Sequence, residues 1–382
     1  MNGPPDDVPV LDDGTVTLRA HRPDDVRGVV GFATDPVSRR WTGVPRPYDD
    51  SDAIVFIESR WAGWERGSTW AFAVACADGV DPSGFAGSVN LTPRGGTLAE
   101  IGFGIHPAVR GRGVATRAVS LLLDWGFETR GLETVLWRAE VGNDASRRLA
   151  WRSGFTFEGT SRRTLARPDR MVDAWQATLL ATDSREPKSR WLEPVNLRGP
   201  RVVLREPQAK DEQRYVDTLN DPESLTWLGT IPMPRDTDEF RARYPERRVG
   251  NSLGASVEWV VADPDTDAYL ATISLFGFHS LDYLSAEVGY RTHPDARGRG
   301  LLTEALRLVI QHAFTVIDHG GLGLDRISLG AGDGNVGSQA VARACGFTET
   351  GRDRRNYDLD DGRVVDLVRF DLLRSEWLPA GG

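Results

Sequence analysis

The amino-acid sequence predicts an α/β protein made of two consecutive domains, each with a mixed β-sheet and helices that connect neighbouring strands. Three observations support this prediction. The chain has 382 residues, and at roughly 100 to 200 residues per domain it is too long for one small domain. A long segment of the sequence occurs twice. In both copies, short stretches of alternating apolar residues precede longer stretches with helical spacing of apolar residues.

The duplication is clearest around a histidine, proline, arginine and glycine block. Residues 106–113 are HPAVRGRG, and 187 residues later residues 293–300 are HPDARGRG. A later block that begins at Asn143 recurs at Asn335, where the offset has grown to 192 residues. A slowly growing offset indicates a duplicated domain with loop insertions, because the units of repeat proteins are only about 20 to 50 residues long.

A polar, proline-containing segment separates the two copies. We therefore expect an N-terminal domain over 1–182, a linker over 183–193 and a C-terminal domain over 194–382.

The same order of elements is predicted in each copy. The expected strands, first copy and then second, are 16–18 and 202–204, 70–74 and 257–261, 100–105 and 287–291, and 134–139 and 326–329. Early helices end near the Asp-Pro pairs at 35–36 and 221–222, since proline interrupts a helix. A strongly apolar helix follows each Arg-Gly-Arg-Gly loop.

Composition and charge limit the classes of partner. The chain has 46 Lys and Arg against 55 Asp and Glu, a net charge of −9. An acidic protein repels polyanions, so neither nucleic acid nor a membrane is expected as a partner. The two cysteines, Cys76 and Cys345, do not form a disulfide framework, and the N-terminal residues have no apolar run. These features predict a cytoplasmic protein. No metal-ligand pattern is present, so no metal is expected.

The glycine loops predict an anion site. A strand that ends in Arg-Gly-Arg-Gly and continues into a helix exposes backbone N–H groups at the positive end of the helix dipole. Glycine lets a phosphate approach the backbone, and arginine supplies charge. Other phosphate motifs fit poorly: no G-x-x-x-x-G-K-[S/T] segment exists, and residues 330–335 lack the last glycine of the dinucleotide fingerprint.

These blocks resemble the GNAT superfamily of acetyl-CoA-dependent N-acyltransferases, most closely its Rim-type ribosomal-protein branch, twice over nearly the whole chain. Residues 110–115 are similar to the family's [Q/R]-x-x-G-x-[G/A] loop, and the second copy departs from it at Leu302. The resemblance implies two tandem GNAT domains and acetyl-CoA, or another acyl-CoA, as co-substrate. The implied cofactor-binding residues are Ile105, Arg110, Gly111, Arg112, Gly113, Ala115, Asn143, Arg297, Gly298, Arg299, Gly300 and Asn335.

The resemblance also implies catalytic residues. An amine must lose a proton before it attacks a thioester, and Glu100 and Glu287 are the expected general bases, acting through water. The alternative is a carboxylate that faces solvent or orients the substrate. Ser146 and Ser338 are expected to protonate or hydrogen-bond the leaving thiolate, or else to belong to a helix cap. The two asparagines either bond the pantetheine arm or cap the same helices.

The predicted function is acetyl transfer from acetyl-CoA to a primary amine, with a small-molecule acceptor such as an antibiotic or specialised metabolite. Two alternatives stay open: a ribosomal-type protein N-terminal acetyltransferase, or one catalytic half joined to a non-catalytic CoA-binding or scaffolding half. The late loops differ in charge, since 162–170 is basic and 356–361 acidic. We therefore expect the second half to attract a cationic amine better than the first.

Overall fold

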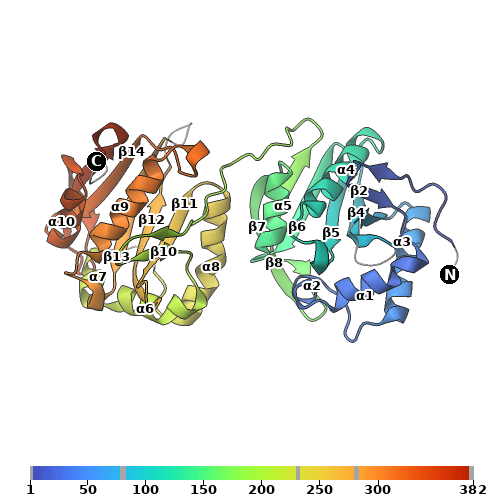
Figure 1. Cartoon of the computed structure of the whole chain (residues 1–382), viewed down its shortest axis with the longest axis horizontal. Coiled ribbons are helices and arrows are strands. Elements are labelled where there is room, and N and C mark those ends of the chain that lie inside the picture. The colour runs from blue at the N-terminus through green and yellow to red at the C-terminus, as the bar shows by residue number, and fades with distance from the viewer. Residues whose placement is uncertain (1–2, 78–82, 229–232, 279–283, 378–382) are drawn as a thin grey trace. The chain divides into compact units, whose positions relative to one another are not determined.

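The computed structural model describes residues 3–77, 83–228, 233–278 and 284–377 (Figure 1). The chain divides into two compact units, Met1–Lys188 and Ser189–Gly382. The limits predicted for the linker stay a prediction, and each unit is described by itself.

The first unit alternates helices with the strands of one sheet. In chain order its elements are β1 (Leu11–Asp12), β2 (Val16–Arg19), η1 (Pro23–Asp25), α1 (Val26–Thr34), α2 (Pro36–Trp41), α3 (Asp50–Glu65), β3 (Trp70–Cys76), β4 (Phe85–Gly95), β5 (Leu98–Ile105), η2 (Pro107–Val109), α4 (Val114–Glu128), β6 (Thr134–Glu140), α5 (Asp144–Arg152), β7 (Thr156–Ala166) and β8 (Met171–Leu180).

The second unit repeats this order. Its elements are β9 (Leu197–Arg198), β10 (Val203–Arg205), η3 (Ala209–Asp211), α6 (Glu212–Asn220), α7 (Pro222–Leu228), α8 (Thr237–Ser252), β11 (Ser256–Ala262), β12 (Tyr269–Phe276), β13 (Ser285–Thr292), η4 (Pro294–Ala296), α9 (Leu301–Phe314), η5 (Ile317–His319), β14 (Arg326–Gly332), α10 (Val336–Ala344), β15 (Thr348–Asp358), β16 (Val364–Leu373) and η6 (Arg374–Glu376).

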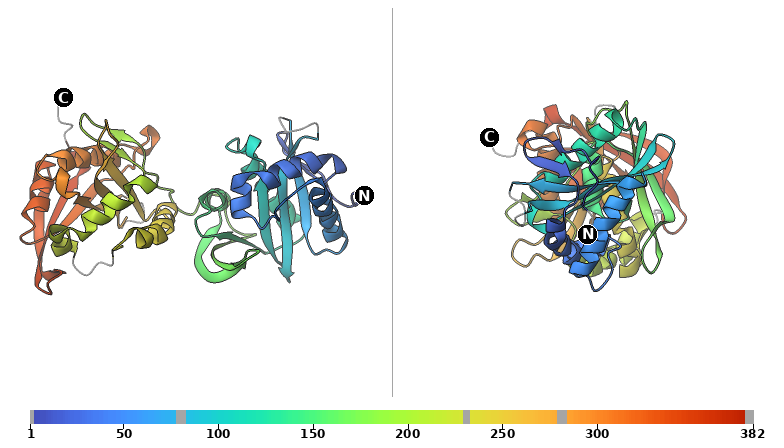
Figure 2. Two further views of the ribbon diagram at one scale, coloured as in Figure 1. Left: turned by 90° about the horizontal axis from the view of Figure 1, so that it is seen from below. Right: turned by 90° about the vertical axis from the view of Figure 1, so that its right-hand side faces the viewer.

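The two sheets have the same strand order. It is β1-β2-β3-β4-β5-β6-β8-β7 in the first unit and β9-β10-β11-β12-β13-β14-β16-β15 in the second. All neighbouring strands are antiparallel except one central pair in each sheet, β5 with β6 and β13 with β14. Helices pack on the sheets (Figure 2). The predicted fold class, an α/β protein with a mixed sheet in each half, is confirmed.

Alternation along the strands of the second unit produces a core on each face of its sheet. Val257, Trp259 and Val261 of β11 pack with α9, whereas Val260 and Ala262 pack with side chains of α6 and α8. This is the period of two expected for a strand covered on both sides. The helix that follows the glycine loop and the early helices therefore lie on opposite faces of the sheet.

Matching helices start at matching caps. Asp35 Oδ2 accepts the N–H of Ser38 at 2.8 Å, and Pro36 is the first residue of α2. Asp221 Oδ2 accepts the N–H of Ser224 at 3.0 Å at the start of α7. An aspartate cap followed by proline favours a helix start, because the cap satisfies an N–H that the helix leaves unpaired and proline has none.

A buried histidine links the stability of the first unit to pH. His21 is 1% exposed, its Nε2 lies 3.1 Å from Ser88 Oγ, and burial lowers its pKa to about 3. In the unfolded chain the histidine has a pKa of about 6.5. Between these values the unfolded state takes up a proton that the folded state does not, so folding stability falls as the pH falls below about 6.5.

We expect the free energy of unfolding to decrease by about 1.4 kcal/mol per pH unit below pH 6.5 through His21 alone. His21→Gln should remove that part of the slope in urea unfolding between pH 7 and pH 5. His319→Gln, which changes an exposed histidine, is the control and should keep the wild-type slope. Equal slopes for the wild type and His21→Gln would contradict the prediction.

Candidate functional site

In each unit the two central parallel strands separate before they end. In the first unit β5 pairs with β6 only as far as Ile101 and Trp137, although β5 continues to Ile105. In the second unit β13 pairs with β14 only as far as Glu287 and Ser328. Beyond these pairs, the facing edges of the two strands are not joined by a hydrogen-bonded ladder. Ligands of α/β proteins commonly bind at the carboxyl ends of parallel strands where such openings form.

The glycine loops follow β5 and β13 at this opening. Gly111 and Gly113 have φ of 77° and 78°, and Gly298 and Gly300 have φ of 68° and 71°. Other residues rarely adopt this left-handed conformation. A Cβ atom at Gly111, Gly113 or Gly298 would meet nothing within 4 Å, so the backbone faces open space.

Helix α4 begins directly after Gly113 and helix α9 directly after Gly300, with no side chain capping either helix. Ala115 and Leu302 lie in the first turns, and both are half-buried. The first N–H groups of an uncapped helix, together with left-handed glycines, form a concave arrangement that binds anions. Both loops therefore have the geometry predicted for a phosphate cradle.

The two arginines of each loop have different surroundings. Arg110 Nη2 donates to Asp35 Oδ2 at 2.7 Å and to Ser38 Oγ at 2.8 Å, and its Nε donates to the carbonyl of Ile105 at 3.2 Å. Arg297 likewise pairs with Asp221 and bonds Ser224 Oγ at 2.9 Å.

The first arginine therefore fixes the loop to the cap of α2 or α7. The carbonyl of the buried Ile105 already accepts a hydrogen bond from Arg110. The second arginine of each loop, Arg112 or Arg299, is exposed. Sequence reasoning missed Asp35 and Asp221, which it took only as helix breakers. The signal was present, because Asp-Pro followed by serine recurs 186 residues apart.

The asparagine and serine of the later block form a helix cap in both units. Asn143 Oδ1 accepts the N–H of Ser146 at 3.2 Å, and Asn335 Oδ1 accepts that of Ser338 at 3.0 Å. The structure thus has the capping arrangement that the sequence left as an alternative. The asparagine oxygens are occupied, and a bond from these residues to a pantetheine arm stays a prediction.

Each serine hydroxyl also contacts an aromatic group on a strand. Trp137 Nε1 donates to Ser146 Oγ at 3.1 Å. Tyr290 Oη lies 3.2 Å from Ser338 Oγ and donates to the Ser338 carbonyl at 3.0 Å. Burial raises the pKa of the Tyr290 phenol, so it stays protonated. An indole can only donate, which leaves the Ser146 proton available to another acceptor. Sequence reasoning missed Tyr290, because Phe103 stands at its position in the first copy.

Glu100 is enclosed by two guanidinium groups. Arg94 donates to Oε2 at 2.9 and 2.6 Å, and Arg138 donates to both carboxylate oxygens at 2.9 to 3.1 Å, five hydrogen bonds in total. A carboxylate has about four lone-pair positions, and these bonds occupy them. The geometry therefore does not favour Glu100 as a general base. It belongs to an ion-pair network on this face of the sheet.

Glu287 has the same position in the second copy but a different environment. Among the residues that the structure describes, no hydrogen bond or ion pair reaches its carboxylate, and the residue is half-buried. Gly330 stands 192 residues after Arg138 and replaces that arginine. A Cβ atom on Gly330 would lie 3.6 Å from Glu287 Oε1, so the carboxylate extends over this glycine.

The neighbouring position shows the same contrast. In the first unit Glu140 is paired with Arg40 at 3.0 Å and with Arg167 at 2.8 Å. In the second unit this position is Gly332. A Cβ atom there would lie 2.9 Å from the Tyr357 ring and 3.1 Å from the Trp227 ring, and Tyr357 Oη donates to the Trp227 carbonyl. The first unit therefore has a chain of ion pairs where the second has an aromatic wall.

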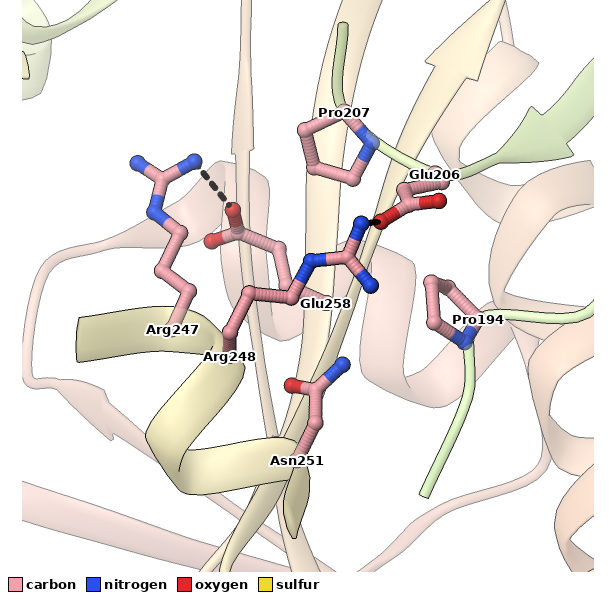
Figure 3. A pocket seen from close by; sticks show the side chains of 7 residues that line it. All are labelled: Pro194, Glu206, Pro207, Arg247, Arg248, Asn251 and Glu258. Atoms are coloured by element: carbon pink, nitrogen blue, oxygen red, sulfur yellow. Dashed lines mark ion pairs between the residues drawn. The ribbon is translucent and has the colours of Figure 1, made fainter. Parts of the chain in front are cut away.

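A pocket in the second unit contains none of the predicted site residues. It is lined by Pro194, Glu206, Pro207, Arg247, Arg248, Asn251 and Glu258 (Figure 3). Arg247 is paired with Glu258 at 2.9 Å, and Arg248 is paired with Glu206. Its cationic groups are thus already paired within the protein.

The described ranges contain neither a metal-ligand cluster nor a membrane-spanning helix. Across residues 3–77, 83–228, 233–278 and 284–377, no three His, Cys, Asp or Glu side chains gather as a metal site would require. Within these same ranges, no helix has the length and apolar character needed to cross a bilayer.

Comparison with known proteins gives a family match in each unit and several relatives that cover about half of the chain. The family described as acetyltransferase (GNAT) domain matches residues 15–156 and 201–348. The putative ribosomal N-acetyltransferase YdaF of Bacillus subtilis (strain 168) is 29% identical over 181 residues, which are 46% of this chain and 93% of that protein. The uncharacterized N-acetyltransferase p20 of Bacillus licheniformis is 27% identical over 46% of this chain and 95% of its own length. A solved structure of a probable acetyltransferase, 26% identical, covers 48% of this chain and 99% of its own, with a TM-score of 0.42.

The contacts of the loop arginines predict separable effects on stability. Arg297→Met leaves the carboxylate of Asp221, 17% exposed, without its cation, and we expect a loss of about 1 to 3 kcal/mol in the free energy of unfolding. The exposed Arg299 is the matched control, and Arg299→Met should change stability by no more than about 0.5 kcal/mol. Urea unfolding of both variants measures the difference, and equal losses would show that Arg297 does not fix the loop.

Proposed function

Because the chain belongs to the acetyltransferase (GNAT) domain family, we propose that it transfers the acetyl group of acetyl-CoA to the amino terminus of a protein, as a ribosomal-type N-acetyltransferase. The family match covers both units and confirms the GNAT fold and the acetyltransferase class expected from the sequence. A cytoplasmic location stays a prediction from composition.

The predicted small-molecule acceptor is corrected here. YdaF, which matches 46% of this chain, is named a putative ribosomal N-acetyltransferase, and that finding contradicts an antibiotic or metabolite amine. The small-molecule prediction rests on the two fused domains and on the acidic net charge of −9, which suit a cationic metabolite. Net charge is a weak guide to one acceptor, because a protein N-terminus is itself a cationic amine and fits the same argument.

The observation that carries the proposal is the left-handed glycine loop at an uncapped helix start, present in both units. Such a loop suits the diphosphate of coenzyme A, since backbone N–H groups point at the anion and the helix dipole favours negative charge. The exposed Arg112 and Arg299 supply positive charge beside it.

The residues at the opening between the strands support direct transfer. Glu287, with a free carboxylate, accepts a proton from the acceptor ammonium through water. The amine nitrogen then attacks the thioester carbonyl carbon and the C–S bond breaks. The Ser338 hydroxyl gives its proton to the leaving thiolate and takes up, through water, the second proton that the attacking nitrogen loses. No protein nucleophile is needed, because both reactants are held side by side.

Isothermal titration should find two equivalents of coenzyme A per chain. Gly113→Val and Gly300→Val should each remove one equivalent, since a β-branched residue does not adopt the left-handed conformation at φ of 78° and 71°. The controls are Gly131→Val and Gly362→Val, at φ of 64° and 82°, where a Cβ atom also meets nothing within 4 Å. Two equivalents should persist in these controls. One equivalent in the wild type would contradict the paired cradles.

Acceptor class can be tested with peptides that match the N-terminal sequences of ribosomal proteins. We expect release of free thiol from acetyl-CoA and an acetyl group on the α-amine, located by mass spectrometry. The same peptides with a blocked α-amine should be inert even when they contain lysine. Acetylation confined to lysine side chains would refute the proposed acceptor.

A further inference from the structure

We propose that acetyl transfer takes place in the second unit only, and that Gly330 makes this possible by leaving Glu287 unpaired. The first unit then binds acetyl-CoA without turning it over. This inference rests on the proposed function and assigns the reaction to one of two sites that the sequence presents as equivalent.

The lone pairs of the two carboxylates have different partners. A general base must direct a lone pair at the acceptor or at a bridging water. Glu100 directs its lone pairs at Arg94 and Arg138, in five hydrogen bonds of 2.6 to 3.1 Å. Charge-assisted bonds of this kind are about twice as strong as neutral ones. Glu100 would have to give up several of them to act.

The arginines that hold Glu100 in the first unit are not repeated around Glu287. On β14, Ile327, Leu329 and Ala331 belong to the core beneath α9, so the alternate residues face the other side of the sheet. These alternate residues are Arg326, Ser328, Gly330 and Gly332. Arg326 is the charged one among them, and its Nε is paired with Asp371 at 2.8 Å. The connection before β13, residues 277–284, contains no arginine or lysine in its sequence. Neither of the partners that hold Glu100 thus has a counterpart here.

An acceptor ammonium would meet different charges in the two units. In the first unit Arg40, Arg94, Arg138 and Arg167 surround two carboxylates, Glu100 and Glu140. The surplus of positive charge repels an ammonium group.

In the second unit the same face has the carboxylate of Glu287, unpaired within the described residues, and the guanidinium of Arg291. Arg369 on this face is paired with Asp353 at 2.7 Å, so these charges balance. The rings of Trp227 and Tyr357 lie over Gly332. Carboxylates and aromatic faces both attract an ammonium group. The second unit therefore suits a protein N-terminus, and the first unit does not.

The loops proposed to bind the co-substrate are alike in the two units. The left-handed glycines and uncapped helix starts are common to both units. What differs between the units lies on the acceptor side of the opening. The first unit is thus expected to keep its affinity for coenzyme A.

The experiment restores in the second unit the arginine that holds Glu100 in the first. Gly330→Arg should pair with Glu287 and lower kcat about 100-fold or more, and Glu287→Gln should do the same. Gly330→Met is the matched control. Its side chain is also long and also meets Leu367, whose Cδ1 would lie 3.1 Å from the new Cβ, but it has no charge. We expect Gly330→Met to retain a kcat at least about tenfold higher than that of Gly330→Arg.

The first unit supplies the complementary test. Glu100→Gln should change kcat by less than about threefold, although it weakens the ion pairs with Arg94 and Arg138 and should lower the melting temperature. All variants should still bind two equivalents of coenzyme A, which separates loss of chemistry from loss of folding.

Two results would overturn the inference alone: a loss of kcat in Glu100→Gln as large as in Glu287→Gln, or equal activity in Gly330→Arg and Gly330→Met. A wild-type chain that binds two equivalents of coenzyme A but acetylates no peptide α-amine would instead overturn the proposed function, and the inference with it. The outcomes are thus distinguishable.

Discussion

The parting of one parallel strand pair in each sheet is the constraint on which the rest of the structure depends. Beyond Ile101 in β5 and Glu287 in β13, the edge that faces the neighbouring parallel strand has no ladder. Backbone N–H and C=O groups cannot stay unpaired without cost, so such an edge must meet water or a ligand. Both glycine loops and both glutamates lie on the strands or loops that border this opening, and Ser146 and Ser338 lie in the first turns of the helices that follow β6 and β14. The candidate site residues are therefore gathered at one place in each unit.

Support for the glycine loops comes from outside them. Left-handed glycines make a loop able to bind an anion but also able to move, since glycine has little conformational preference. Arg110 and Arg297 counter this by bonding the caps of α2 and α7. The arginine that looks most like a ligand in the sequence is thus the one that positions the cradle. A second ion pair recurs in the same way and is buried. It joins Arg19 to Asp25 at the start of α1, and Arg205 to Asp211 at the start of α6.

Duplication preserved the backbone of the two units and changed the side chains on one face of the sheet. Arg138 and Glu140 of β6 correspond to Gly330 and Gly332 of β14. Each of these differences alters charge without altering the strand, because the side chains project from the face and take no part in the ladder. Two units with one fold can therefore hold the same co-substrate and treat the acceptor differently.

The sequence by itself determined the duplication, the order of the main elements along the chain, the glycine loops and the family. Repeated letters, apolar period and glycine at left-handed positions are local properties of the chain. It could not distinguish Glu100 from Glu287, since both stand in the same short motif. Only the tertiary structure did so. It brings Arg94 and Arg138, from the strands on either side of β5, onto Glu100 and brings no cation onto Glu287 within the described ranges. Whether a carboxylate is paired depends on neighbours across the sheet, and a strand's own sequence contains no record of them.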